Sequence, residues 1–143
     1  MTRNVEVHPT APPIMSRILV CFPEVDVSRV IITYGGAIWV PSGNRISREL
    51  FAHECVHIEQ QDAVGTDAWW DHYFVDPEFR YEQELVAHRA EVNAFVKRHG
   101  GGTKKCRAYR EECARRLSGA MYGNVRTYSQ VMNDLLHIET RVA

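Results

Sequence analysis

Hydrophobic residues recur at two different spacings along this chain, and these spacings predict helices and a short β-hairpin. Apolar side chains every three to four positions are typical of a helix with one buried face, whereas β-branched and aromatic runs favour strands. Two strand-forming runs, 30–34 and 37–40, are separated by Gly35-Gly36, a dipeptide that suits a tight turn. The pattern predicts an α+β fold that is mainly helical. The helical spacing covers residues 14–22, 47–64, 76–99, 104–117 and 127–141.

Capping residues mark where the two longest predicted helices begin and end. Ser47 is suited to cap the first of them, and Gly65 is placed to end it. Asp76-Pro77 should start the second, because aspartate accepts hydrogen bonds from free N–H groups and proline fits the first helical position. Between the two helices we predict that residues 65–75 form a loop that reverses the chain and lays the helices side by side.

The composition indicates one folded domain. Three prolines near the start predict an extended arm over residues 1–13, followed by a single domain over residues 14–143. With 17 Lys+Arg against 18 Asp+Glu, the net charge of −1 argues against a nucleic-acid partner. No apolar run approaches the roughly 20 residues that span a bilayer, so we predict no membrane segment. The start lacks a secretory signal, so we expect the protein in the cytoplasm.

One short motif carries recognisable chemistry. His53-Glu54-Cys55-Val56-His57 is an HExxH sequence in the middle of the predicted helix 47–64. A spacing of four places the two imidazoles on one helix face, where both can bind one Zn²⁺ ion. Glu54 can then take a proton from the water in the open coordination position. The motif predicts a site for one zinc ion with Glu54 as the catalytic base.

Zinc needs a third protein ligand, and the next predicted helix offers several. Glu84 follows His57 by 27 residues, and His88 and Glu91 lie one and two turns farther along. Glu82 lies on a different face of that helix and becomes an alternative if the register is shifted by two residues.

The two helices together resemble the gluzincin branch of the zincin metallopeptidases. In that branch HExxH is followed by a helix with a ligand glutamate, a small residue three positions on and a polar residue four positions on. Glu84, Ala87 and His88 match these positions. The resemblance implies that Glu84 is the third metal ligand, that Ala87 lets the helices approach closely, and that His88 orients a ligand histidine. It also implies a zincin-like fold with a small sheet packed over the active-site helix.

The chain departs from the family at one of these positions and from other zincin classes more strongly. The family more often has an acidic residue where this chain has His88, so this imidazole could hydrogen-bond a ligand or bind the metal itself. The metzincin pattern requires a glycine and a histidine where this chain has Gln60 and Ala63, which excludes that class. Gly65-Thr66-Asp67 partly resembles the aspzincin segment, so Asp67 is a second candidate for the third ligand.

The resemblance also assigns roles in binding a peptide. Zincins have an edge strand above the active-site helix, and here the strand nearest the motif contains Ile38, Trp39 and Val40. This strand could bind a peptide or protein substrate by strand addition, or simply cover the helix. A hydroxyl or imidazole should stabilise the oxyanion formed during cleavage. The candidates for this donor are His72, Tyr73, Tyr81 and Tyr122, of which Tyr73 and Tyr122 are preferred.

The chain as a whole looks like the small single-domain HExxH proteins that phages and prophages encode. The resemblance implies a minimal zinc metallopeptidase, in which a partner protein could assist substrate recognition because so short a chain forms only a shallow groove. The alternative is a zinc-stabilised structural or interaction module, such as a phage-particle component, that cleaves nothing. A structural site is closed by a fourth protein ligand, whereas a catalytic site is not.

Overall fold

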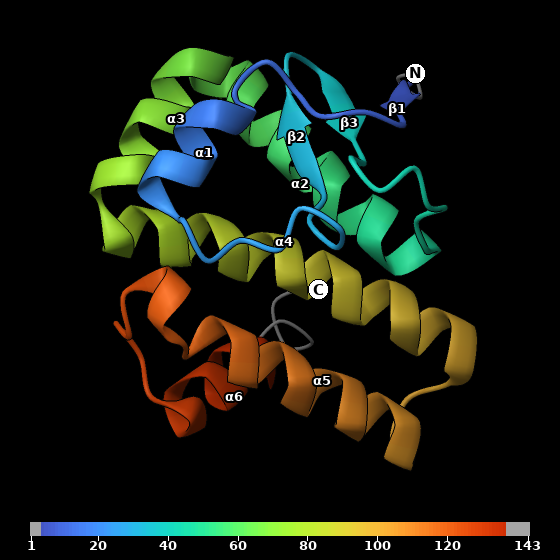
Figure 1. Cartoon of the computed structure of the whole chain (residues 1–143). Helices are drawn as coiled ribbons and strands as arrows, with labels where there is room; N and C mark the ends of the chain where they lie inside the picture. The colour runs from blue at the N-terminus through green and yellow to red at the C-terminus, as the bar shows by residue number, and fades with distance from the viewer. Residues whose placement is uncertain (1–3, 137–143) are drawn as a thin grey trace.

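The computed structural model describes residues 4–136, and its longest helix divides the molecule into two parts (Figure 1). On one side of this helix, α4 (Pro77–His99), lie α1 (Met15–Cys21), α2 (Arg48–Val64), α3 (Thr66–Val75) and a small sheet. On the other side lie α5 (Lys104–Leu117), the 3-10 turn η1 (Ala120–Tyr122) and α6 (Tyr128–Leu136). The fold is α+β and mostly helical, as predicted.

The ends of α2 and α4 confirm the predicted caps. The hydroxyl of Ser47 accepts a hydrogen bond from the main-chain N–H of Leu50 at 3.2 Å. The carboxylate of Asp76 accepts from the N–H groups of Glu78 and Phe79, at 3.1 and 3.2 Å. These bonds satisfy N–H groups that have no partner within the helix.

The prediction of a loop over residues 65–75 is wrong, because most of this segment forms α3. Gly65, with φ of +95°, ends α2 and directly precedes α3. The side chains of Trp69, Trp70 and Tyr73 are buried in a core cluster with residues of α1. The burial of one aromatic face against α1 stabilises this helix. The chain therefore reverses in two corners, at Gly65 and at Asp76, and α2 still packs along α4.

The sheet contains the predicted hairpin and one further strand that precedes α1. The strand order is β1 (Val7–His8), β3 (Ala37–Trp39) and β2 (Ile32–Tyr34), with β1 parallel and β2 antiparallel to β3. Main-chain hydrogen bonds join Ile38 N to Glu6 O at 2.9 Å and Val40 N to His8 O at 2.8 Å. Part of the predicted arm is therefore a strand of the sheet.

The pairing of β1 corrects the expectation that Ile38, Trp39 and Val40 form a free edge above the active-site helix. β3 has a hydrogen-bonded strand on each side, so its backbone is not available for strand addition. The error has a physical cause, because a two-residue strand such as β1 leaves no hydrophobic pattern and pairs with residues about thirty positions away.

Of the three hydrophobic clusters among residues 4–136, the two larger ones lie on opposite sides of α4, and the third joins the sheet to α2. One of the two larger cores joins α1, β2 and α3, and the other joins α4, α5 and α6. Helices α1, α5 and α6 lie where the spacing of apolar residues predicted them, and residues 137–141 of the last predicted helix lie outside the described residues. Among residues 4–136, no helix combines the length and the apolar character needed to cross a membrane.

Candidate metal centre

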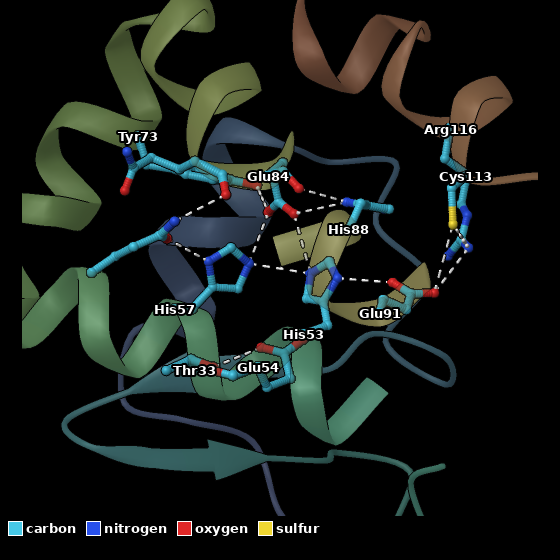
Figure 2. A network of polar contacts seen from close by, with 12 residues as sticks. Thr33, His53, Glu54, His57, Tyr73, Glu84, His88, Glu91, Cys113 and Arg116 are labelled. Atoms are coloured by element: carbon cyan, nitrogen blue, oxygen red, sulfur yellow. Dashed lines mark hydrogen bonds and ion pairs between the residues drawn. The ribbon is translucent and has the colours of Figure 1, made fainter. Parts of the chain in front are cut away.

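Helices α2 and α4 bring three ligand atoms together inside the protein (Figure 2). The Nε2 atoms of His53 and His57 lie 3.2 Å apart. The two oxygens of the Glu84 carboxylate each face one imidazole, with Oε2 3.2 Å from His53 Nε2 and Oε1 3.4 Å from His57 Nε2. A tetrahedral zinc ion with bonds of about 2.0–2.1 Å separates neighbouring ligand atoms by roughly 3.3–3.4 Å. The separation of the two imidazole nitrogens, and of each from a carboxylate oxygen, is therefore close to that between ligands of one metal ion.

The other ring nitrogen of each histidine is held by an oxygen. His53 Nδ1 lies 2.9 Å from the carboxylate of Glu91, and His57 Nδ1 lies 2.8 Å from the side-chain oxygen of Gln60. The amide nitrogen of Gln60 donates to the main-chain oxygen of Gln83 at 3.0 Å, so its oxygen must face the histidine. Both Nδ1 atoms therefore act as donors, so Nε2 is the nitrogen of each ring that would bind a metal in place of a proton.

The structure places His88 against Glu84 rather than against a histidine nitrogen. His88 Nδ1 lies 2.8 Å from the main-chain oxygen of Glu84 and 3.7 Å from its carboxylate. Burial, followed by the nearby charge of His53, lowers the pKa of His88 to about 4, so the ring is neutral. His53 Nδ1 instead donates its hydrogen bond to Glu91, one turn farther along α4.

Buried residues around these helices could hold a metal ion. Ligand atoms of His53, Glu84 and His88 all lie within 4.8 Å of one another, as do those of His88, Glu91 and Cys113. Arg116 lies 3.6 Å from the carboxylate of Glu91 and 3.7 Å from the sulfur of Cys113 (Figure 2). This guanidinium opposes a cation beside Cys113, so the position between the two helices fits a metal better.

Glu54 lies beside the three ligand groups but is held by the sheet. Its carboxylate accepts a hydrogen bond from the hydroxyl of Thr33 in β2 at 2.6 Å (Figure 2). The side chain is buried, and this burial raises the pKa of the Glu54 carboxyl above its ordinary value. A carboxylate with a raised pKa, held at one oxygen, is well suited to accept a proton at the other.

The ligand groups form a strongly coupled set of charges. Burial acts to lower the pKa of His53, but the hydrogen bonds of Glu84 and Glu91 outweigh it and raise that pKa to about 10. Burial acts to raise the pKa of Glu84, but the two histidines hold it well below its ordinary value. The charges of the histidines and carboxylates thus stabilise one another at the position that a divalent cation would occupy.

A cavity of about 610 Å³ opens onto this site. The metal-site residues, Glu54 and Thr33 form part of its wall, and apolar side chains of α1, β2 and α3 form another part. The prediction assigned the strand wall to β3, whereas residues of β2 and the segment before it line the cavity. These residues are Val30, Ile31, Ile32 and Thr33.

Two of the four candidate oxyanion donors lie at this cavity. Tyr73 donates its hydroxyl to the carboxylate of Glu84 at 2.8 Å, and half-buried Tyr122 lines the cavity from the other part of the molecule. His72 and Tyr81 lie elsewhere, paired with Asp76 at 3.0 Å and Asp134 at 2.7 Å. Of the four candidates, the two preferred tyrosines are therefore the ones that line the cavity.

The alternative ligands remain outside the cluster. Asp67 begins α3 and accepts a hydrogen bond from the Tyr34 hydroxyl at 3.0 Å, and Glu82 is exposed on α4. Sequence reasoning assigned no role to Thr33 or Gln60 and left Glu91 as one of several ligand candidates. Glu91 follows Glu84 by seven residues and so shares its helix face, which was a usable signal.

Comparisons with protein-family models, with curated proteins and with solved structures found no match for this chain.

Proposed function

We propose that this protein is a gluzincin-like zinc metallopeptidase. The observation that carries the proposal is that His53 Nε2 and His57 Nε2 lie 3.2 Å apart and that each lies 3.2–3.4 Å from an oxygen of the Glu84 carboxylate, with Glu54 beside them. Two imidazoles and one carboxylate form a ligand set found in catalytic zinc sites. The cavity at this site supplies room for a substrate.

Each part of the site has a defined task in this proposal. His53, His57 and Glu84 hold the zinc ion, which when bound supplies Lewis acidity and lowers the pKa of a coordinated water. Glu54 accepts a proton and later delivers it to the leaving amine, while Thr33 keeps its carboxylate in place. The hydroxyl of Tyr122 is the donor available to the oxygen of the scissile carbonyl, whereas that of Tyr73 donates to the Glu84 carboxylate and holds this ligand in place.

The sheet suggests a path for the substrate that differs from the one first predicted. β2 is the outer strand on the cavity side, but its Thr33 carbonyl already accepts hydrogen bonds from Gln61 and Trp70, at 2.9 and 3.1 Å. A peptide backbone would therefore follow the segment 30–32, which lines the cavity before Thr33.

The metal content of purified protein tests the ligand set. We expect about one zinc ion per chain in the wild type, measured by elemental mass spectrometry, and a large loss in Glu84→Ala. Glu82→Ala is the matched control, because Glu82 lies on the same helix and is exposed. Equal zinc content in wild type and Glu84→Ala would contradict the proposed site.

Cleavage of a mixed peptide library, followed by mass spectrometry, tests the reaction. Glu54→Gln preserves the shape of the side chain but removes its basicity, so we expect the cleavage rate to fall by about 100-fold or more while zinc is retained. A Glu54→Gln variant that cleaves as fast as the zinc-loaded wild type would rule out this mechanism.

A second candidate function is a zinc-stabilised module without catalysis, and one observation favours it. A ligand atom of His88 lies within 4.8 Å of those of His53 and Glu84, so His88 could close the site. The hydrogen bond from His88 Nδ1 to the Glu84 carbonyl makes Nε2 the nitrogen of His88 that would bind the metal in such a closed site. Retention of zinc by His88→Ala supports the catalytic site, and loss of zinc supports the closed one.

A further inference from the structure

Gln61 carries a buried hydrogen-bond acceptor to which no residue in the described part of the chain donates. The side chain is 1 % exposed, and its amide nitrogen donates to the main-chain oxygen of Thr33 at 2.9 Å. Its amide oxygen, Oε1, has no hydrogen-bond partner among residues 4–136. Buried acceptors nearly always have a donor, so a group from outside the described chain is expected here.

The orientation of this amide is fixed by its surroundings. The Thr33 oxygen also accepts a hydrogen bond from the indole N–H of Trp70 at 3.1 Å. If the Gln61 amide were turned over, its oxygen would face the Thr33 oxygen at the same short distance, and the two would repel each other. The unpartnered atom is therefore the oxygen, and its ligand must be a donor.

The position of Gln61 connects this acceptor with the metal site. Gln61 lines the same cavity as His53, His57 and Glu84. It follows His57 by four residues on α2, so it lies about one helical turn, roughly 5.4 Å, farther along. An extended peptide advances about 3.3 Å per residue. If one peptide group of a bound peptide lies at the metal, an N–H group one or two residues farther along that peptide would therefore reach Gln61.

We propose that Gln61 Oε1 accepts a hydrogen bond from a main-chain N–H of a peptide bound in this cavity. The inference rests on the proposed function and names a residue that positions the substrate. A neutral acceptor fits a neutral amide donor, because a cationic amine would require a carboxylate at this point. The aromatic rings of Trp69 and Trp70 line the same cavity and surround the peptide with apolar contacts.

Two peptide hydroxamates provide the probe, because a hydroxamate binds zinc without being cleaved. One carries a Leu-Ala amide and the other has a methyl group on the alanine nitrogen, which removes the N–H. We expect the zinc-loaded wild type to bind the hydroxamate with the free N–H at least tenfold more tightly than the methylated one, as measured by calorimetry, and this ratio is the preference. In Gln61→Met, which lacks an acceptor, this preference should fall at least fivefold.

A conservative variant controls for changes in structure. Gln61→Glu, studied at mildly acidic pH, presents a neutral carboxyl group that donates to Thr33 and keeps an acceptor, so it should keep the wild-type preference. Loss of the preference in this variant would overturn the inference even if Gln61→Met does not fold.

The outcomes separate this inference from the proposed function. If folded, zinc-loaded Gln61→Met keeps the wild-type preference, the role of Gln61 is overturned but the proposed function is not. The hydrogen-bond partner of Gln61 Oε1 is then a water molecule. Failure of zinc-loaded wild type to bind either hydroxamate overturns both proposals. Because binding is measured, neither result depends on whether Glu54 supports cleavage.

Discussion

At the residue scale, the sequence predicted the groups that share a helix face but not those that meet across elements. The spacing of His53 and His57 follows from helix geometry, and Glu84 follows from the resemblance to gluzincins. The partner of Glu54 could not be predicted, because Thr33 lies in a strand twenty-one residues earlier and no local pattern connects the two. The orphan acceptor of Gln61 is likewise visible only when its surroundings are known.

Glu91 offers a test of how His53 is held. Burial acts to raise the pKa of Glu91, but the hydrogen bond from His53 outweighs it and keeps that pKa at about 2. Glu91→Gln keeps the shape but removes the charge, so we expect zinc affinity to fall about tenfold in a competition titration with a chelator. Glu82→Gln, on the exposed face of α4, should leave the affinity unchanged. Equal affinity in both variants would show that Glu91 does not assist His53.

At the element scale, capping residues located the helices well, whereas residues 65–75 were predicted to form a loop and instead form α3. Ser47 and Asp76 have side chains that can complete a helix end, so the sequence alone fixes those positions. In residues 65–75, apolar side chains at 69, 70, 73 and 74 do have helical spacing. A short helix of this kind depends on packing against α1, and that contact cannot be inferred from local sequence.

The cap of α4 predicts a pH dependence of stability. The hydrogen bonds from His72 and from the Phe79 N–H lower the pKa of Asp76 below its ordinary value of 3.8. A carboxyl group with a lowered pKa stabilises the fold above the ordinary pKa, and this contribution is lost as the pH falls through the lower, folded value. Asp76→Asn should therefore be less stable than wild type at pH 6 in urea unfolding. The difference should shrink towards pH 3, and a difference independent of pH would contradict this account.

The loop after η1 is held against the start of α4 by a close contact. Gly123 has φ of +76°, and a Cβ atom added there would lie 2.5 Å from Cβ of Pro77. Gly43 has φ of +75° and no atom within 4 Å of such a Cβ, so it is a matched control. Both alanine variants bear backbone strain of about 1–2 kcal/mol. Because of the clash, the free energy of unfolding of Gly123→Ala in urea should fall by about 1–3 kcal/mol more than that of Gly43→Ala. Equal losses would show that the contact relaxes freely.

At the scale of the whole molecule, α4 links the metal site to both hydrophobic cores. It carries Glu84 and Glu91 on one face, and it packs against α2 on one side and α5 on the other (Figure 1). The overall α+β class was predictable because the hairpin and most of the helices are marked locally, by β-branched runs, caps or helical spacing of apolar residues. The order of strands was not, because it depends on a contact between the start of the chain and residue 38.

Metal binding should therefore stabilise the whole fold. Zinc at a hundredfold excess over its dissociation constant adds about 2.7 kcal/mol to the free energy of unfolding. For a chain of 143 residues this corresponds to roughly 9 °C in Tm. Calorimetry with zinc and then with a chelator measures this shift, and Glu84→Ala should show little of it. A wild-type Tm that does not respond to zinc would exclude a metal site coupled to folding.

The short strand β1 has a consequence for the behaviour of the protein in solution. A strand with an open edge can pair with a strand of another chain and seed aggregation. Glu6 and His8 occupy the hydrogen-bonding groups of β3 on that side, and the ring of His8 lies 4.3 Å from that of Trp39. Without this strand, β3 would present an apolar edge to neighbouring molecules. The main-chain pairing of β1 thus keeps this side of β3 from joining a strand of another molecule.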